Sequence, residues 1–254
     1  MTVALNHRVE GPEGAPVLVL LNSLGADLRM WEPQAAALRG ELRLVRLDTR
    51  GHGDSPVPAG PWTLADLGGD VLALLDSLGI ERASFAGVSL GGSTAVWLAA
   101  HAPERVDRVL ACFTAAWFGS PDPWLKRAEI VRAKGVEAVA DAVIDRWFTE
   151  EVDPGLRARM REMIVATPPE GYAAATEVVA DLDLREDLGR ITAPTLVVSG
   201  AEDPACPPEV GRALAAGIPG AEFVEVEGAA HLGNLERPDA VTDLIRAHLA
   251  KETP

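Results

Sequence analysis

Residues 83–101, ASFAGVSLGGSTAVWLAAH, join an apolar run to a helical pattern through a glycine-rich turn. The first six residues predict a buried strand, and Leu90–His101 predict a helix. Between them, Ser89 stands in the pattern Gly-x-Ser-x-Gly, with Gly87 and Gly91 as its small neighbours. A serine at so sharp a strand-to-helix turn holds its hydroxyl above the carboxyl edge of the sheet, where open α/β sheets bind ligands. We therefore predict that Ser89 is the nucleophile of an α/β protein.

Short apolar runs recur along the chain and alternate with helical patterns. Thr63 and Asp66 predict a capping box, and apolar residues at helical spacing follow as far as Gly79. This alternation is typical of a mostly parallel central sheet flanked by helices, which is the fold class that we predict. The further strands predicted are Val17–Leu21, Leu42–Leu47, Arg108–Phe113, Thr195–Ser199 and Glu222–Val226.

The alternation is interrupted once, between residues 117 and 191. This stretch holds helical patterns broken by prolines and no convincing strand. We expect residues 117–191 to form a helical lid over the site, inserted into a core made of residues 1–116 and 192–254. The alternative is a set of extra helices packed on the sheet.

Composition limits the classes of function. The chain has 254 residues, 48% of them hydrophobic, which excludes an intrinsically disordered protein. Its formal net charge of −15 argues against a protein that binds nucleic acid or an anionic membrane surface. Two cysteines are too few for a disulfide framework or a cysteine-rich zinc site.

The chain gives no sign of membrane insertion or export. No apolar run reaches the length of a transmembrane helix. The N-terminal residues, MTVALNHRVEGPEG, lack the basic start and long apolar stretch of a signal peptide. We therefore expect a soluble cytoplasmic protein that acts on a small molecule, with a homo-oligomer left open.

A serine hydroxyl needs a base to become a nucleophile, and the base needs an acidic partner. Among the five histidines, we select His231 because small residues on both sides let its ring reach over the sheet edge. His52, in a glycine-rich turn, is the rival candidate. We expect structural roles for His7 and His101, and a solvated position for His248.

Asp203 is the predicted acid, because it follows the strand Thr195–Ser199 closely, and Glu202 is the local alternative. The resulting order, Ser89, Asp203, His231, is the one found in the α/β-hydrolase fold. An oxyanion hole needs two N–H groups aimed at one point. We predict that Leu90, directly after the nucleophile, supplies one and that Leu24, in the loop after Val17–Leu21, supplies the other.

At this point the chain resembles α/β-hydrolases over nearly its whole length. Residues 48–55, DTRGHGDS, look like the D-x-R-G-x-G-x-S turn of that fold, in which the arginine, here Arg50, is usually structural. Residues 200–203 and His231 with residues 236–238 look like its acid and histidine segments. This resemblance implies an α/β-hydrolase fold with the helical lid inserted after the sixth strand.

A more specific resemblance is to 3-oxoadipate enol-lactonases of the β-ketoadipate pathway. It is carried by residues 21–31, 48–53, 114–116, 119–121 with Trp124, and 146–149, which span both core and lid. Two departures stand out, since Trp117 replaces an expected basic residue and Phe113 an expected asparagine. They predict a more apolar pocket than is usual in that family.

The resemblance implies hydrolysis of an enol-lactone, in aromatic catabolism, through an acyl-enzyme and without a metal or organic cofactor. Because the family's substrate carries a free carboxylate, an acidic protein needs a local cation to hold it. Trp124 and Arg127 fall on one face of a predicted helix with Val131 and Lys134. We expect Trp124 to cover the substrate ring and Arg127 to bind its carboxylate, whereas the alternative is a lid helix with solvated cations.

Three other functions remain open from the sequence. The same triad could cleave simple esters or a different small lactone. It could also serve a cofactor-free reaction other than hydrolysis, such as perhydrolysis or a lyase step. A non-catalytic binding protein on this fold is disfavoured, because Ser89, Asp203 and His231 are all present.

Overall fold

The computed structural model describes residues 1–251, which form a seven-stranded sheet in the order β1-β3-β2-β4-β5-β6-β7. All neighbouring strands run parallel except β1, which pairs antiparallel with β3 at one edge. This confirms the predicted α/β architecture. The strands are β1 (His7–Glu10), β2 (Val17–Leu21), β3 (Arg43–Leu47), β4 (Ala83–Val88), β5 (Val106–Cys112), β6 (Thr195–Gly200) and β7 (Glu222–Val226).

The central strands are buried on both faces, as their continuous apolar runs predict. Every residue of β4 and of β6 is buried, whereas the edge strand β7 is mostly half-exposed. A parallel sheet needs such cover because its connecting helices lie across both faces. The apolar runs therefore report burial, and each predicted strand is found within two residues of its expected ends.

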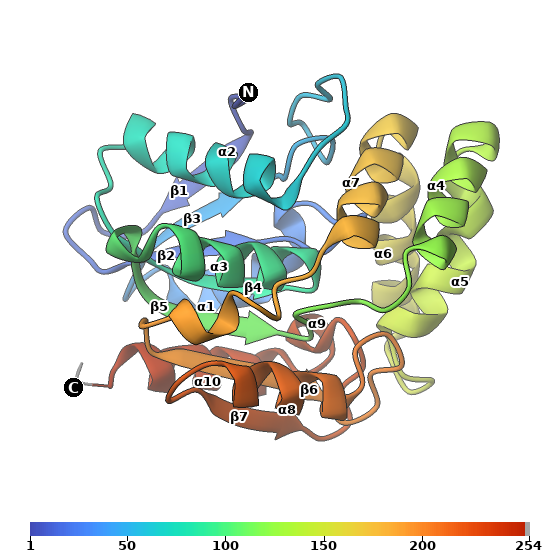
Figure 1. Ribbon diagram of the computed structural model, residues 1–254. Coiled ribbons are helices and arrows are strands. Elements are labelled where there is room, and N and C mark those ends of the chain that lie inside the picture. The colour runs from blue at the N-terminus through green and yellow to red at the C-terminus, as the bar shows by residue number, and fades with distance from the viewer. Residues whose placement is uncertain (252–254) are drawn as a thin grey trace.

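Helices cover both faces of the sheet (Figure 1). Helices α2, α3 and α8 lie on one face, and α1 and α10 lie on the other. Thr63 and Asp66 form the predicted capping box at the start of α2, and Gly79 follows its end with a φ of 65°. The helices outside the insertion are α1 (Glu32–Leu38), α2 (Leu64–Ser77), α3 (Leu90–His101), α8 (Pro208–Gly217), α9 (Gly233–Glu236) and α10 (Pro238–Leu249), with 3-10 turns at Leu28–Trp31, Pro103–Arg105 and Leu188–Arg190.

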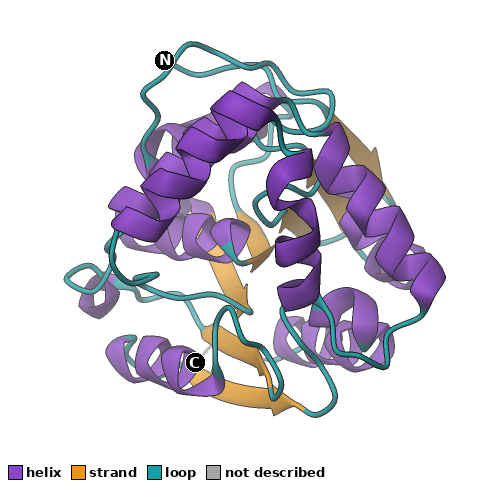
Figure 2. Ribbon diagram, turned by 90° about the vertical axis from the view of Figure 1, so that its right-hand side faces the viewer, coloured by secondary structure: helices purple, strands orange, loops and turns teal. Residues whose placement is uncertain are grey.

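Four helices fill the interruption between β5 and β6: α4 (Asp122–Lys134), α5 (Glu137–Trp147), α6 (Pro154–Ala166) and α7 (Pro169–Asp181). They gather beyond the carboxyl ends of the strands, and Figure 2 looks onto them from that side. At their base, Trp117 and Asp183 form an isolated antiparallel bridge, and the Leu184 N–H donates to the Ala116 carbonyl at 2.8 Å. The two ends of the insertion are thus tied together where they leave the core.

The expectation that these helices follow the sixth strand is wrong for this chain. They follow the fifth strand, β5, because the segment before β2 contributes a single strand, β1, to the sheet. Within residues 1–251, no helix is long and apolar enough to cross a membrane.

Candidate active site

Ser89 occupies the turn between β4 and α3 with a φ of 55° and a ψ of −119°. A residue other than glycine rarely adopts a positive φ, so the backbone of this turn is strained. The motif glycines allow it: a Cβ at Gly87 would lie 2.2 Å from the Gly91 carbonyl oxygen, and one at Gly91 would lie 2.4 Å from the Leu21 carbonyl oxygen. Gly-x-Ser-x-Gly is therefore required here by the close approach of three backbone segments.

The backbone of Ser89 is held by hydrogen bonds from neighbouring elements. Its N–H donates to the Cys112 carbonyl at 3.0 Å. Its carbonyl accepts from the Thr114 hydroxyl at 2.7 Å and from the Ser93 N–H at 2.9 Å. These contacts hold the strained turn in place, and the supporting role of Thr114 was not predicted.

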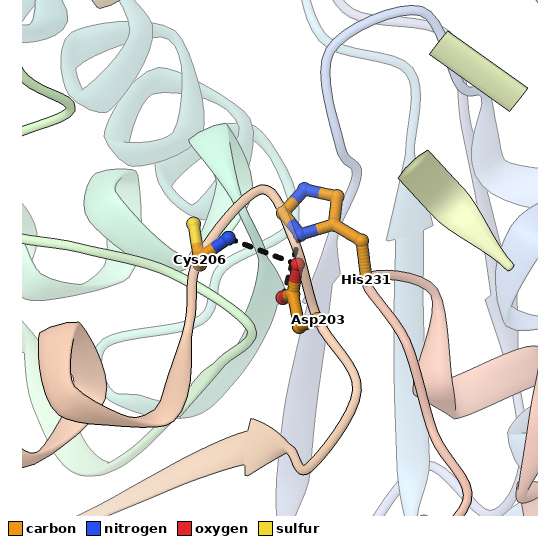
Figure 3. Close-up of side chains that lie close together, drawn as sticks. All are labelled: Asp203, Cys206 and His231. Carbon is orange, nitrogen blue, oxygen red and sulfur yellow. Dashed lines mark hydrogen bonds and ion pairs between the residues drawn. The ribbon is translucent and has the colours of Figure 1, made fainter. Parts of the chain in front are cut away.

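His231 and Asp203 come together from two different loops, as the sequence predicts. Nδ1 of His231 lies 2.9 Å from Oδ2 of Asp203, and both side chains are buried (Figure 3). The other carboxylate oxygen, Oδ1, accepts from the N–H groups of Ala205 and Cys206 at 2.8 and 2.9 Å. An ionised carboxylate only accepts hydrogen bonds, so Nδ1 carries the proton and Nε2, which points away from Asp203, is left with its lone pair.

The loop of His231 is tied to the helical insertion. The Leu232 N–H donates to the Trp147 carbonyl, at the end of α5, at 2.9 Å. The carboxylate of Glu236 accepts from the Ala230 N–H and, through its other oxygen, from the Thr149 N–H and hydroxyl at 2.6–2.8 Å. The position of the imidazole is thus linked to that of the insertion.

The N–H groups of Leu24 and Leu90 are the predicted oxyanion donors. Leu90 begins α3, and the first N–H groups of a helix have no partner within it. Neither N–H is bonded to another residue in the described part of the chain. Leu24 lines the same cavity as Ser89, and Leu90 follows Ser89 directly at the start of α3.

The carboxyl edge of the sheet and the insertion line a small, partly open cavity of about 60 Å³. Leu24, Ser89 and His231 lie on its core side, and Trp124 and Arg127 lie on its insertion side, so five of the predicted site residues surround one space. The full lining is Ser23, Leu24, Ser89, Trp124, Arg127, Val143, Arg146, Trp147, Tyr172, Ala205 and His231. Arg146 and Tyr172 were missed by the sequence analysis.

Trp124 and Arg127 are organised as a pair. The guanidinium of Arg127 lies over the Trp124 ring at 4.6 Å, and the indole N–H of Trp124 donates to the Phe118 carbonyl at 3.1 Å. Stacking of this kind keeps a guanidinium charged while fixing its plane. Arg127 is therefore held over the cavity with its N–H groups available.

Trp117 and Phe113, from which a more apolar pocket was expected, do not line the cavity at Ser89. Trp117 is 43% exposed and stacks with Arg185 outside the cavity. Phe113 is buried with a φ of 49°, and its ring occupies the space where a Cβ on Gly233 would stand. Neither residue lines the cavity, which instead contains two arginines.

The other histidines and the alternative acid, Glu202, do not line the cavity at Ser89. Glu202 is exposed. His52 is buried, with Nε2 accepting from the Gly25 N–H at 2.9 Å, so it supports the loop of Leu24. His248, expected to be solvated, is only 2% exposed because its ring packs near the Pro194 carbonyl, 3.2 Å from Nε2.

Within residues 1–251, Asp203, Cys206 and His231 form a cluster whose ligand atoms lie within 4.8 Å of one another. A thiol binds a metal as the thiolate, but burial and the Asp203 carboxylate hold the pKa of Cys206 well above its usual range. The oxygens of Asp203 already accept three hydrogen bonds. The cluster is thus suited to orienting an imidazole rather than to binding a metal.

The sequence is similar to a known family and to proteins of known function. The alpha/beta hydrolase family matches residues 18–244. The chain is 40% identical over 248 residues to 3-oxoadipate enol-lactonase 2 of Acinetobacter baylyi, covering 96% of this chain and 92% of that protein.

Solved structures of the same fold also match this chain over almost its whole length. The crystal structure of the enol-lactonase from Burkholderia xenovorans LB400 is 47% identical with a TM-score of 0.95, covering 97% of this chain and 96% of that one. A thermophilic esterase from Thermogutta terrifontis, with malate bound, is 33% identical with a TM-score of 0.91, covering 96% and 92%.

Proposed function

This chain belongs to the alpha/beta hydrolase family, and on that premise we propose that it hydrolyses a carboxylic ester, the enol-lactone of 3-oxoadipate, through an acyl-enzyme. The observation that carries the proposal is the arrangement of Ser89 and His231 around one cavity, with His231 bonded to Asp203. The similarity to two enol-lactonases supports the choice of substrate.

In the proposed reaction, the hydroxyl oxygen of Ser89 attacks the carbonyl carbon of the lactone while its proton moves to Nε2 of His231. The ring C–O bond then breaks, and the proton passes from His231 to the leaving enol oxygen. Water attacks the acyl-enzyme in the same way, which releases the carboxylic acid and restores the Ser89 hydroxyl. The enol formed in the first step tautomerises to the ketone, 3-oxoadipate. Asp203 stays ionised throughout and holds the imidazole in the required tautomer.

The N–H groups of Leu24 and Leu90 stabilise the oxyanion that forms on the carbonyl oxygen. Loss of one such donor typically costs about 3 kcal/mol of barrier. The N-terminus of α3 adds the partial positive charge of its helix dipole at the same point.

Residues 117–191 act as the lid of the site, on a core of residues 1–116 and 192–254. Small-molecule sites usually enclose roughly 300–1,000 Å³, whereas the cavity at Ser89 measures about 60 Å³. We propose that the lid moves to widen this space as the lactone binds. With the lactone bound, Trp124 covers the lactone ring and Arg127 faces its carboxylate.

Turnover of a small panel by the wild type and Ser89→Ala tests this function. The panel holds 3-oxoadipate enol-lactone, a neutral five-membered lactone and a neutral aryl ester. We expect the acidic enol-lactone to give the highest kcat/KM and 3-oxoadipate as the product. Ser89→Ala should lose turnover of all three, whereas Ser77→Ala, on the exposed face of α2, should behave as wild type.

Labelling by an active-site phosphonate, read by peptide mass spectrometry, identifies the nucleophile. Attachment to Ser89 is expected. A preference for the aryl ester would reassign the chain to a simple esterase. A product other than the hydrolysed acid would indicate a perhydrolase or lyase, and a protein that neither turns over the panel nor takes the label is not a hydrolase.

A further inference from the structure

Two arginines from different helices face the cavity at Ser89. Arg127 comes from α4 and is half-buried, and Arg146 comes from the last turn of α5 and is exposed at the cavity edge. Neither makes an ion pair with a carboxylate within residues 1–251. Two like charges on one wall repel each other, and an anion between them would relieve that repulsion.

Other arginines of the insertion, on α4 and α6, are neutralised by carboxylates of the lid. Arg132 pairs with Glu170 and Glu177, Arg157 with Asp145, and Arg161 with Glu137 and Asp141. The chain has 38 acidic residues against 23 basic ones, so acidic partners are abundant. The cations that face the cavity are therefore left without the partners that their neighbours have.

Tyr172 adds a third polar group to the same wall. Its side chain is fully buried, it lines the cavity from α7, and its hydroxyl lies beside Arg127 without a hydrogen bond of normal geometry to any group within residues 1–251. Burial raises the pKa of this phenol, and the nearby Arg127 partly opposes that shift. A buried hydroxyl without a partner is costly, typically about 1–3 kcal/mol, and a bound acceptor would remove that cost.

We propose that Arg146 and Tyr172, together with Arg127, form a carboxylate-binding site that selects lactones bearing a free acid group. The inference rests on the proposed function and extends it by assigning Arg146 and Tyr172 to recognition of the substrate anion.

A carboxylate is the ligand that this set of donors fits. Two guanidinium groups and a neutral phenol offer N–H and O–H donors, and an ionised carboxylate offers only acceptors. In the enol-lactone of 3-oxoadipate, one of the two acid groups is closed into the ring and the other stays free. Binding that free group at the lid wall leaves the ring carbonyl to face Ser89, so recognition at one end orients the reaction at the other.

Binding is measured apart from catalysis in the Ser89→Ala protein. The probe is furan-2-acetate, a five-membered oxygen ring with a –CH2–COO⁻ group, and furan-2-acetamide is its neutral counterpart. Isothermal titration should show tighter binding of the acid. Arg146→Met should weaken binding of the acid by about 10- to 100-fold, the loss expected for charge-assisted hydrogen bonds, and should reduce the preference for the acid over the amide.

Arg159→Met is the matched control. Arg159 is an exposed lid arginine without a carboxylate partner, but it lines a different groove, beside Leu156 and Glu162. It should leave both affinities unchanged. Equal affinities of the Arg146→Met and Arg159→Met proteins for the acid would overturn the proposal, as would a failure of the acid to bind the Ser89→Ala protein.

Tyr172→Phe separates recognition from structure. Removing a buried, unpartnered hydroxyl should raise the midpoint of thermal unfolding while weakening binding of the acid several-fold. A lower midpoint with unchanged affinity would show a structural role instead and would remove Tyr172 from the site. Because these measurements need no turnover, the carboxylate site can stand if lactone hydrolysis fails, and hydrolysis can stand if the carboxylate site fails.

Discussion

Nε2 of His52 accepts a hydrogen bond from the backbone N–H of Gly25 at 2.9 Å, one residue after the proposed oxyanion donor Leu24. Its other nitrogen, Nδ1, lies 3.1 Å from the Arg50 carbonyl and therefore donates to it. A protonated imidazole would have no lone pair for Gly25, so only the neutral ring fits this position. His52 is thus a positioning residue for the loop that carries Leu24.

His52→Ala should lower kcat more than it raises KM, by about 10- to 100-fold, because a displaced donor stabilises the oxyanion less than a well-placed one. His52→Gln keeps an acceptor and should recover part of the loss. His101→Ala, at the far end of α3, is the control and should leave both constants unchanged. A His52→Ala enzyme with wild-type kcat would refute this role.

The stability of the protein should fall as the pH drops below about 6.5, the usual pKa of an unfolded histidine. Burial lowers the pKa of His52, and it lowers the pKa of His248 as well. A folded-state pKa below the unfolded value means that the unfolded chain binds more protons, so the stabilisation present above pH 6.5 is lost towards the folded pKa. Each group contributes at most about 1.4 kcal/mol per pH unit.

Urea unfolding at pH 7.5 and at pH 5.5 measures this loss. The difference between the two free energies of unfolding should shrink in His52→Gln, which does not titrate in this range. The same difference in wild type and variant would show that His52 has an ordinary pKa.

Gly87→Ala should destabilise the fold by about 3 kcal/mol or more, because its Cβ would lie 2.2 Å from the Gly91 carbonyl oxygen. The atoms that it meets are backbone and cannot rotate away. Gly40→Ala is the matched control, since nothing lies within 4 Å of its Cβ. Thermal unfolding of both variants checks the prediction, and similar midpoints would contradict it.

Most of the framework could be predicted because it depends on local pattern. The apolar runs of β2 and β4 match their observed ends, since burial on a sheet leaves a direct trace in composition. The turn at Ser89 could be predicted because Gly87 and Gly91 mark it in the sequence. Loop residues after strands, such as Asp203, could be placed because parallel strands end at one edge.

The side-chain positions that the sequence did not predict depend on packing between segments that are distant in the chain. Arg146 looks like any helical arginine, and only the packing of α5 against α4 and α6 places it at the cavity of Ser89. His248 was misplaced because its burial depends on contact with Pro194, 54 residues away. Trp117 lies outside the cavity for the same reason, since its ring stacks with Arg185 and its backbone pairs with Asp183.

Both thiols should be unreactive in the folded protein. Burial raises the pKa of Cys112 to about 12, and burial together with Asp203 raises the pKa of Cys206 well above its usual range. Because the thiolate is the reactive form, alkylation by iodoacetamide at pH 8 should be at least about 100-fold slower than for free cysteine. Mass spectrometry should find both thiols modified after denaturation, and rapid labelling of the native protein would contradict the buried positions.

Asp203→Asn should be the most damaging conservative change in the site outside Ser89 and His231. Three donors point at this carboxylate: the N–H groups of Ala205 and Cys206 at one oxygen, and Nδ1 of His231 at the other. An asparagine must turn its NH2 group towards one of those donors. If it faces His231, the ring adopts the other tautomer, with the proton on Nε2, and can no longer accept the proton of Ser89.

We therefore expect kcat on the enol-lactone to fall by about 10³- to 10⁴-fold, with little change in KM because Asp203 does not line the cavity. Glu202→Gln makes the same change of charge one residue earlier, on an exposed side chain, and should keep wild-type kcat. Steady-state rates of the two variants, with circular dichroism to confirm folding, make the comparison. If the two kcat values were alike, Asp203 would not orient His231, and Glu202 would have to be reconsidered as the acid.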